Sequence, residues 1–365
     1  MIHLDDIADA ANINAHVQQG HIAEVHHPTE PLTLYNYTQA CQWAGAWDHE
    51  TRLCRGLIVN SATGEVVARP FPKFHNLHEH GPESTAGPIT LIPPIRLFDK
   101  VDGSLGIAYR QPSDGRIAWA TRGSFTSDQS RWATNWWNEN HLDHALPEGV
   151  TVLAEIVYPE NRIVVDYGNQ SGLVLLAALD NANGTHLAPL GKTMVDWWPA
   201  DIVVRHGTVD DATDIDPNDR TGVEGYVALS ADGRTRVKLK ADEYVRLHKI
   251  VTGVSTVTIW EMLRHGDDLT QLVEGVPDEF MAWVDATITD LNGRYRGMQA
   301  DAIADYEAIA HLASDRKAFA TEAMKSPHRP LLFALLDGKT YSDMIWRQIK
   351  PERELPFSTR KEDDQ

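Results

Sequence analysis

Short apolar runs separated by turn residues fill the first two thirds of the chain. The runs 55–60 and 66–70 flank a turn at 62–65, which is typical of a β-hairpin. The run 172–179 is apolar throughout, so we expect a central strand there. The acidic stretch 201–219 predicts a loop or a surface helix. Together these patterns predict antiparallel sheets.

The pattern changes near residue 251, where apolar residues begin to recur at helical spacing, as in Val257, Ile259, Met262 and Leu263. Few strand signals follow. The sequence therefore predicts an α+β fold in which residues 1–250 form a domain of antiparallel sheets flanked by helices and residues 251–354 form a separate all-helical domain. We expect the charged end of the chain, residues 355–365, to be disordered.

Tryptophan is concentrated in one expected helix. Ser127 is a candidate N-cap for this helix, which carries Trp132, Trp136 and Trp137. Large aromatic side chains are usually buried, so we expect these rings in the core rather than on a platform for stacking nucleobases.

Two glutamates interrupt apolar strands. Glu155 lies within the run 152–157, and Glu224 precedes the apolar run 226–229. An isolated buried carboxylate costs several kcal/mol, roughly 2–7 for a polar group without a partner. Each glutamate is therefore expected to face a site or to pair with a cation.

Lys100 stands between Asp99 and Asp102 at a turn that continues with Gly103. The apolar residues on both sides predict a strand, a tight turn and a second strand, with the lysine at the mouth of a sheet. A lysine is a nucleophile only as the neutral amine, which requires burial, neighbouring cations or a metal. Alone, the Lys-x-Asp-Gly motif at residues 100–103 is a weak signal of a catalytic lysine, because such tetrapeptides occur in ordinary hairpins.

The charge of the chain is strongly acidic, with one basic stretch. Among 365 residues there are 33 lysines and arginines against 52 acidic residues, a net charge of -19, which excludes binding nucleic acid by bulk attraction. Strand alternation places four basic side chains of the stretch 234–240 on one face. This stretch is the candidate local site for an anion; a polar outer face is the alternative. Its four basic residues are Arg234, Arg236, Lys238 and Lys240.

Other features limit the compartment and the metal chemistry. Cys41 and Cys54 form no Cys-x-x-Cys motif, so we expect a reducing cytoplasm, and no run approaches the ~20 apolar residues of a membrane span. The start of the chain lacks a basic leader before an apolar run. A metal-binding or hydrolytic module on His75, His78 and His80 is an alternative, but we expect three surface histidines.

The order of these weak signals resembles the covalent nucleotidyltransferase superfamily of polynucleotide ligases and capping enzymes, and within it the ATP-dependent RNA ligase 1 family of the phage T4 type. The resemblance covers roughly residues 50–250 and implies the ATP-grasp-like nucleotidyltransferase fold. Its motifs lie at Cys54–Gly56, Arg69–Leu77, Lys100–Leu105, Gly123–Ser124, Asn161–Val164, Glu224–Val227 and Lys238–His248.

The resemblance implies an activity. Lys100 would attack the α-phosphorus of ATP, releasing pyrophosphate and leaving a lysyl-AMP intermediate. AMP would then pass to the 5′-phosphate of an RNA end, and a 3′-hydroxyl would displace it to repair the strand. Lys238 and Lys240 would neutralise the triphosphate and lower the pKa of Lys100.

The resemblance also implies roles for individual residues and for the metal. The metal, Mg²⁺ or Mn²⁺, would be held by Asp102, Glu155 and Glu224. The nucleotide would be contacted by Arg55, Lys73, Asp99, Asp102, Gly103, Arg122, Glu155, Glu224, Lys238 and Lys240.

The implied partners are ATP and single-stranded or broken RNA ends, tRNA among them, with no membrane. We expect a monomer in the cytoplasm, that of the host if the chain is phage-encoded. Two other functions remain open. One is a capping-type RNA guanylyltransferase, which would share the lysine and the glutamates. The other is a non-catalytic protein that binds RNA ends.

Overall fold

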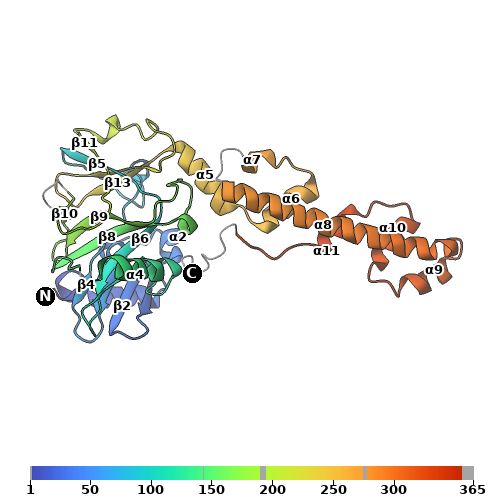
Figure 1. Ribbon diagram of the computed structural model, residues 1–365, viewed down its shortest axis with the longest axis horizontal. Coiled ribbons are helices and arrows are strands. Elements are labelled where there is room, and N and C mark those ends of the chain that lie inside the picture. Colours follow the sequence, from blue (N-terminus) through green and yellow to red (C-terminus); the bar gives the residue numbers. More distant parts are fainter. Residues whose placement is uncertain (1, 143, 190–194, 274–277, 356–365) are drawn as a thin grey trace. The chain divides into compact units, whose positions relative to one another are not determined.

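The computed structural model describes residues 2–142, 144–189, 195–273 and 278–355 (Figure 1). The described residues form two compact units, one of residues 2–246 and one of residues 247–355. Of residues 355–365, for which disorder is expected, Leu355 is described and 356–365 lie outside the described residues. Among the described residues, no helix has both the length and the apolar character needed to cross a membrane.

The first unit contains three antiparallel sheets, with strand orders β1-β2-β3-β4, β10-β9-β8-β6-β7 and β11-β5-β12-β13. In the five-stranded sheet β9 has a neighbour on each side, which agrees with the interior position expected from its apolar run. The strands are β1 Ile22–His26, β2 Leu32–Tyr37, β3 Arg55–Asn60, β4 Val66–Ala68, β5 Ile95–Asp99, β6 Ser104–Arg110, β7 Ile117–Ala120, β8 Val150–Val157, β9 Gly172–Asp180, β10 His186–Ala188, β11 Arg205–Val209, β12 Gly225–Leu229 and β13 Arg236–Lys240.

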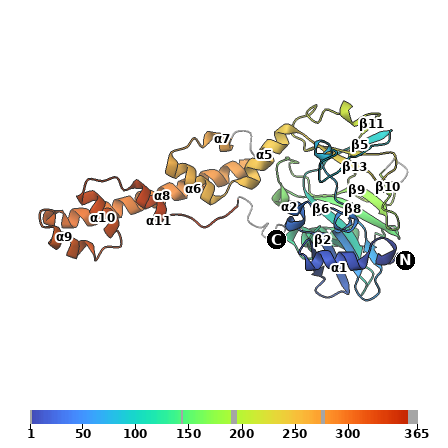
Figure 2. The same ribbon diagram turned by 180° about the vertical axis from the view of Figure 1, so that it is seen from behind.

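The helices differ between the units. Those in the first unit are short and flank the sheets, and Figure 2 shows α1 beside the sheet that contains β2. The described part of the second unit is helical and is built along the long helix α8. Their bounds are α1 Ala10–Gln18, α2 Gln39–Ala44, α3 His49–Leu53, α4 Asp128–His141, α5 Asp242–Gly253, α6 Thr256–His265, α7 Thr270–Val273, α8 Asp278–Ile309, α9 Arg316–Ala323, α10 Arg329–Leu336 and α11 Ser342–Gln348. The predicted α+β class is confirmed.

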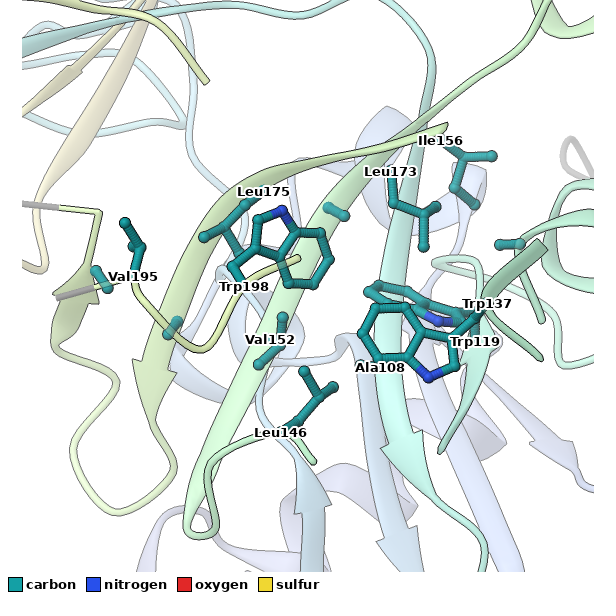
Figure 3. Packing of buried hydrophobic residues seen from close by; sticks show 14 residues of the cluster. Ala108, Trp119, Trp137, Leu146, Val152, Ile156, Leu173, Leu175, Val195 and Trp198 are labelled. Atoms are coloured by element: carbon teal, nitrogen blue, oxygen red, sulfur yellow. The ribbon is translucent and has the colours of Figure 1, made fainter. Parts of the chain in front are cut away.

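The five-stranded sheet is buried on both faces because its strands alternate between two cores. In β8, Val152 and Ile156 pack into the core under α4, whereas Leu153 packs toward β2 and β3. In the core under α4, Trp137 contacts Trp119 and Trp198 at ring-centroid distances of 5.7 and 5.6 Å (Figure 3). This packing holds β8, the strand that contains Glu155, and its neighbour β6, which begins shortly after Lys100.

The expected helix with three tryptophans is α4. The side chain of Ser127 accepts a hydrogen bond from the backbone N–H of Ser130, so the predicted N-cap is confirmed. Trp137 is buried, and Trp132 and Trp136 are half-buried against the same core, as expected for core rings.

The expectation of a loop or helix at 201–219 was wrong for part of the segment. Residues Arg205–Val209 form β11, which pairs with β5. The strand lies at the edge of its sheet and is exposed along four of its five residues. It therefore lacks the apolar alternation by which a strand is recognised in sequence.

His186 supplies a test of the packing between sheets. Its ring is buried and stacks on Phe98 of β5 at 5.7 Å, and its pKa lies well below the ordinary 6.5 because of burial and the nearby Arg236 and Arg96. The folded state keeps His186 neutral, whereas the unfolded state takes up a proton below pH 6.5. Stability should therefore be lost as the pH falls below about 6.5.

We predict that His186→Leu makes this loss shallower by about one proton, or about 1.4 kcal/mol per pH unit, in urea unfolding between pH 5 and 6.5. His78→Leu, at an exposed histidine, is the matched control and should keep the wild-type slope. Equal slopes in all three proteins would contradict this account.

Candidate functional site

Lys100 lies directly after β5, beside the start of β12. Its backbone N–H donates to the carbonyl of Gly225 at 2.9 Å, and the preceding Asp99 is paired with Tyr226. The next strand, β13, pairs Gly225 with Lys240. Three adjacent strands thus bring together residues 100, 224 and 240, which are far apart in sequence.

Glu224 forms two ion pairs at this point. Its Oε2 lies 2.7 Å from Lys100 Nζ, its Oε1 lies 2.9 Å from Lys240 Nζ, and its side chain is 3% exposed. Gly225 has a φ of 127°, and a Cβ there would lie 2.1 Å from the carbonyl oxygen of Leu239, so only glycine fits. This close approach places Glu224 between the two lysines.

The ion pairs determine the charge of Lys100. Burial disfavours its ammonium, but the attraction of Glu224 and then of Glu155 outweighs burial and raises the pKa of Lys100. The converse holds for Glu224, because Lys100 and Lys240 outweigh its burial and lower its pKa. The expectation that neighbouring cations lower the pKa of Lys100 was therefore wrong for this arrangement, since the carboxylates of Glu224 and Glu155 determine the direction of the shift.

Glu155 is the second carboxylate of the site. It lies within β8, opposite Leu105 of β6, and is buried. Burial raises its pKa to about 8, and the negative charge of Glu224 contributes to the shift. At neutral pH Glu155 is therefore mainly a neutral carboxylic acid beside the Lys100–Glu224 pair.

Asp102 binds protein donors with both carboxylate oxygens. Oδ2 accepts from the N–H groups of Val164 and Val165, each at 2.9 Å, and Oδ1 accepts from the Tyr244 hydroxyl at 2.8 Å. The Asp102 N–H donates to the Tyr167 hydroxyl at 2.8 Å. Asp102 thus anchors the turn after Lys100 to segment 164–167 and to the start of α5.

The expected metal ligands are therefore not equivalent. In the part of the chain that the structure describes, no group of three or more histidine, cysteine, aspartate or glutamate side chains is arranged to hold a metal ion. The structure places Glu155 and Glu224 beside Lys100. The carboxylate of Asp102 is instead engaged in hydrogen bonds that hold the surrounding loops in place. Two buried carboxylates with hard oxygen donors remain as candidate ligands.

Arg55 and Lys238 share one aromatic ring. The Arg55 guanidinium lies 5.8 Å and the Lys238 ammonium 4.8 Å from the centre of Phe74. Burial, and then repulsion by Lys100, lowers the pKa of Lys238 well below its usual value. Burial lowers the pKa of Arg55, whose buried Nη1 has no hydrogen-bond partner. Neither group has a carboxylate within 4.0 Å among the residues that the structure describes, although Tyr37 and the more distant Glu155 favour the charged form of Arg55.

Lys73 and Arg122 surround Tyr37 of β2. Lys73 Nζ lies 5.2 Å from the Tyr37 ring and 5.1 Å from the Trp47 ring. Arg122 donates to the Tyr37 hydroxyl at 2.9 Å. Burial alone would raise the pKa of Tyr37, but Arg122, Arg55 and Lys73 lower it.

We call Arg55, Lys73, Arg122 and Lys238 the cation cluster. Among the described residues, none of the four has a carboxylate within 4.0 Å, unlike Lys100 and Lys240. Uncompensated cations in a chain of net charge -19 indicate a site for a bound anion.

Two further predicted residues have structural partners. Asp99 Oδ1 accepts hydrogen bonds from His206 at 2.7 Å and from Arg220 at 2.8 Å. Gly103 lies against β8, since a Cβ there would be 2.6 Å from the carbonyl oxygen of Ile156. The structure thus places Asp99 in contacts with β11 and the loop that follows it, and gives Gly103 a packing role.

The expectation of three surface histidines was wrong for His75. Its side chain is buried, lies 5.7 Å from Trp47, and has a pKa lowered to about 4 by burial. Its carbonyl accepts from the N–H of Lys238, so it supports the site through the backbone. His78 is exposed, as expected.

The sequence reasoning missed Tyr37, Phe74 and Tyr244. Phe74 and Tyr244 lie inside recognised motifs. The available signal for both was an aromatic residue shortly after a lysine, Lys73 for Phe74 and Lys240 for Tyr244. Tyr37 lies outside the motifs at the end of an ordinary apolar strand. Only the packing of the loop after β7 against β2, a strand of another sheet, brings its hydroxyl to Arg122.

Comparison with known proteins identifies a family whose sequence model this chain matches. The sequence model of a family described as RNA ligase matches residues 53–244. The chain is 28% identical over 214 residues to a putative RNA ligase of Thermovibrio ammonificans, covering 55% of this chain and 54% of that protein. It is 28% identical over 284 residues to RNA ligase 1 of bacteriophage TS2126, covering 73% and 68%. The chain thus spans about half the length of the first of these relatives.

Solved structures with a similar arrangement include an archaeal ATP-dependent RNA ligase. It has 13% sequence identity and a TM-score of 0.44, and the match covers 92% of this chain and 97% of that one. A Naegleria gruberi RNA ligase with pyrophosphate has 18% identity and a TM-score of 0.35, covering 42% and 51%.

The two glutamates should differ sharply on substitution. Glu224→Gln leaves two ammonium groups without their anion and should lower the free energy of unfolding by about 3 kcal/mol. Glu155→Gln should leave it unchanged or raise it at pH 7. Wild-type Glu155 loses stabilisation as the pH rises from its ordinary pKa of 4.5 through about 8, and glutamine does not titrate. Urea unfolding at pH 7 tests both; equal losses in the two variants would contradict the assigned charges.

Proposed function

The chain belongs to the RNA ligase family of the phage T4 type, and from this premise we propose that it is an ATP-dependent RNA ligase acting through a lysyl-AMP intermediate. One observation carries the proposal. The cation cluster, with its unpartnered Arg55 Nη1, adjoins a lysine that is paired with a buried glutamate. A polyphosphate and a nucleophile are the two groups that this reaction must bring together.

In the first step, Lys100 Nζ attacks the α-phosphorus of ATP. A P–N bond forms, the bond from the α-phosphorus to the bridging oxygen breaks, and pyrophosphate leaves. Lys100 must first lose a proton, and Glu224 Oε2, at 2.7 Å, is within hydrogen-bonding distance to accept it. Lys240 remains paired with the other oxygen of Glu224 and keeps the carboxylate oriented.

The cation cluster would bind the phosphates. In the part of the chain that the structure describes, Arg55, Lys73, Arg122 and Lys238 have no carboxylate within 4.0 Å, so binding a triphosphate breaks none of the ion pairs seen there. Because Lys238 is held on Phe74 rather than in solvent, its charge would act on the phosphates in a site with little screening.

Glu155, once it has lost its proton, and Glu224 would hold a divalent metal at Lys100, because both supply hard oxygen ligands. When bound, Mg²⁺ or Mn²⁺ would neutralise phosphate charge. Asp102 would act beside them by holding the turn in place through Val164, Val165 and Tyr244.

The later steps follow the family. AMP would pass from Lys100 to the 5′-phosphate of an RNA end, and a 3′-hydroxyl would displace AMP to form the phosphodiester. We propose single-stranded or broken RNA ends as the partner and a monomer in the cytoplasm. We further propose that residues 1–250 are the catalytic domain and that residues 251–354 are a helical domain.

Family membership favours the ligase over a capping guanylyltransferase, and the paired Lys100 favours an enzyme over a protein that only binds RNA ends. Incubation with labelled ATP and, separately, labelled GTP distinguishes these functions. Covalent labelling by GTP alone would identify a guanylyltransferase, and labelling by neither would leave a binding protein.

We predict that Lys100→Arg abolishes covalent labelling by ATP. Arginine keeps a positive charge for Glu224, so the fold should persist, but guanidinium is too weak a nucleophile to attack phosphorus. Lys249→Arg, at an exposed lysine, is the matched control and should label as the wild type does. A labelled Lys100→Arg protein, detected by gel and mass spectrometry, would refute the assignment of the nucleophile.

The rate of lysyl-AMP formation should rise with pH. The pKa of Lys100 is raised, and that of Glu155 is about 8, so at pH 7 the nucleophile and one candidate ligand both hold a proton. Single-turnover rates should increase from pH 6 to about 8.5, by up to about tenfold per unit for each proton lost. In Glu155→Gln the rate should be lower and the pH dependence shallower by one proton. A flat wild-type profile would be incompatible with these protonation states.

A further inference from the structure

Trp43 is an unusually exposed tryptophan. The chain has 11 tryptophans, all within the described residues. Ten of them are buried or half-buried, whereas Trp43 exposes 80% of its surface to solvent. Tryptophan offers a large flat ring that proteins normally bury. The exposure is not a fraying end, because Trp43 lies inside α2, which is capped by Thr38 and ends at Gly45 in the left-handed conformation.

The helix α2 borders the cation cluster. Gln42, next to Trp43, accepts a hydrogen bond from Lys73 Nζ at 3.3 Å. The same ammonium lies against the rings of Trp47 and Tyr37. The Tyr37 hydroxyl in turn accepts a hydrogen bond from Arg122. A line of contacts therefore leads from Gln42, the neighbour of Trp43 in sequence, to the residues proposed to bind phosphate.

We propose that Trp43 is a stacking platform for a nucleobase of the single-stranded RNA end, with Lys73 contacting an adjoining phosphate. This inference rests on the proposed ligase function and assigns part of its RNA-binding surface. An exposed aromatic ring beside cations is the common means of holding single-stranded nucleic acid without reading its sequence.

The charge of the protein makes such a platform necessary. With a net charge of -19 the chain repels RNA at long range, so its affinity must come from local contacts. Stacking does not release counterions and therefore persists at a salt concentration that weakens phosphate contacts. An exposed ring on the helix whose Gln42 contacts Lys73 would combine both kinds of contact.

A protein partner fits this surface less well. The other exposed residues of α2 are Gln39, Ala40, Gln42 and Ala44, so the helix does not present a broad apolar face around the ring. Protein interfaces bury contiguous patches with an apolar centre. A flat ring with polar and small neighbours is better suited to a planar base.

The experiment uses the full-length protein and a fluorescently labelled, 5′-phosphorylated single-stranded RNA of about ten nucleotides. Stacking by one tryptophan accounts for roughly a 10-fold change in affinity. Trp43→Ala should weaken RNA binding and raise the KM for RNA in sealing by about tenfold, and Trp43→Phe should give an intermediate loss. Leu142→Ala, at another exposed apolar side chain of the same unit, is the matched control and should bind as the wild type does.

Two further measurements separate stacking from charge. Trp43→Ala should keep the wild-type slope of log affinity against log salt, whereas Lys73→Ala should reduce the slope by about 0.7. RNA with abasic nucleotides at the bound end should bind the wild type and Trp43→Ala equally, because the base that stacks is missing.

Each outcome decides the proposal. Lysyl-AMP formation is measured on the Trp43 and Leu142 variants so that misfolding is recognised, and folding of Lys73→Ala is checked by urea unfolding, because Lys73 is itself proposed to bind ATP. A misfolded Trp43→Ala leaves the comparison to Trp43→Phe. Quenching of tryptophan fluorescence by RNA that is lost in Trp43→Phe would support the platform. Unchanged RNA affinity in a Trp43 variant that forms lysyl-AMP would overturn the proposal. It would also be overturned if Trp43→Ala changed the molecular mass of the protein in solution, because that change would identify Trp43 as a contact between protein chains. A wild type that forms no lysyl-AMP refutes the ligase function instead.

Discussion

The buried carboxylate of Glu224, held between the ammonium groups of Lys100 and Lys240, is the interaction on which the site depends. It requires β5, β12 and β13 to be adjacent, and it requires glycine at position 225, where the chain passes against Leu239. Removing one partner of a buried ion pair leaves the other charge without compensation. The arrangement of this sheet and the charge of the nucleophile therefore depend on the same three residues.

The rest of the site keeps positive charge in an acidic protein without neutralising it. Phe74 lies against Arg55 and Lys238, and Tyr37 lies against Lys73 and Arg122. Aromatic faces attract cations but, unlike carboxylates, do not cancel their charge for an incoming anion. Pairing would have been more stabilising locally and would have weakened phosphate binding. The aromatic residues thus preserve the binding capacity that the net charge of -19 otherwise opposes.

Local sequence signals predicted much of the fold and the principal side chains. Apolar runs gave most strands, and a glutamate in an apolar run was a sound sign of a site at Glu155, because an unpaired buried carboxylate is costly. The contacts of Asp102 with Val164 and Val165 could not be predicted, since they join two loops that are far apart in sequence. The raised pKa of Lys100 was missed for a related reason: its sign depends on whether Glu224 or Lys238 lies closer, which spacing in sequence does not reveal.

The contacts also bear on how one cation cluster could serve successive substrates. From Gln42 they run through Lys73 and Tyr37 to Arg122, and beyond them Arg55 and Lys238 share the ring of Phe74. In the proposed reaction, departure of pyrophosphate frees these cations while AMP stays on Lys100. The next anion to arrive is the 5′-phosphate of RNA, and a strand held at Trp43 would reach the cluster from its outer edge. The same charges can then bind first the triphosphate and afterwards the RNA, because none of them is paired with a carboxylate among residues 2–142, 144–189, 195–273 and 278–355.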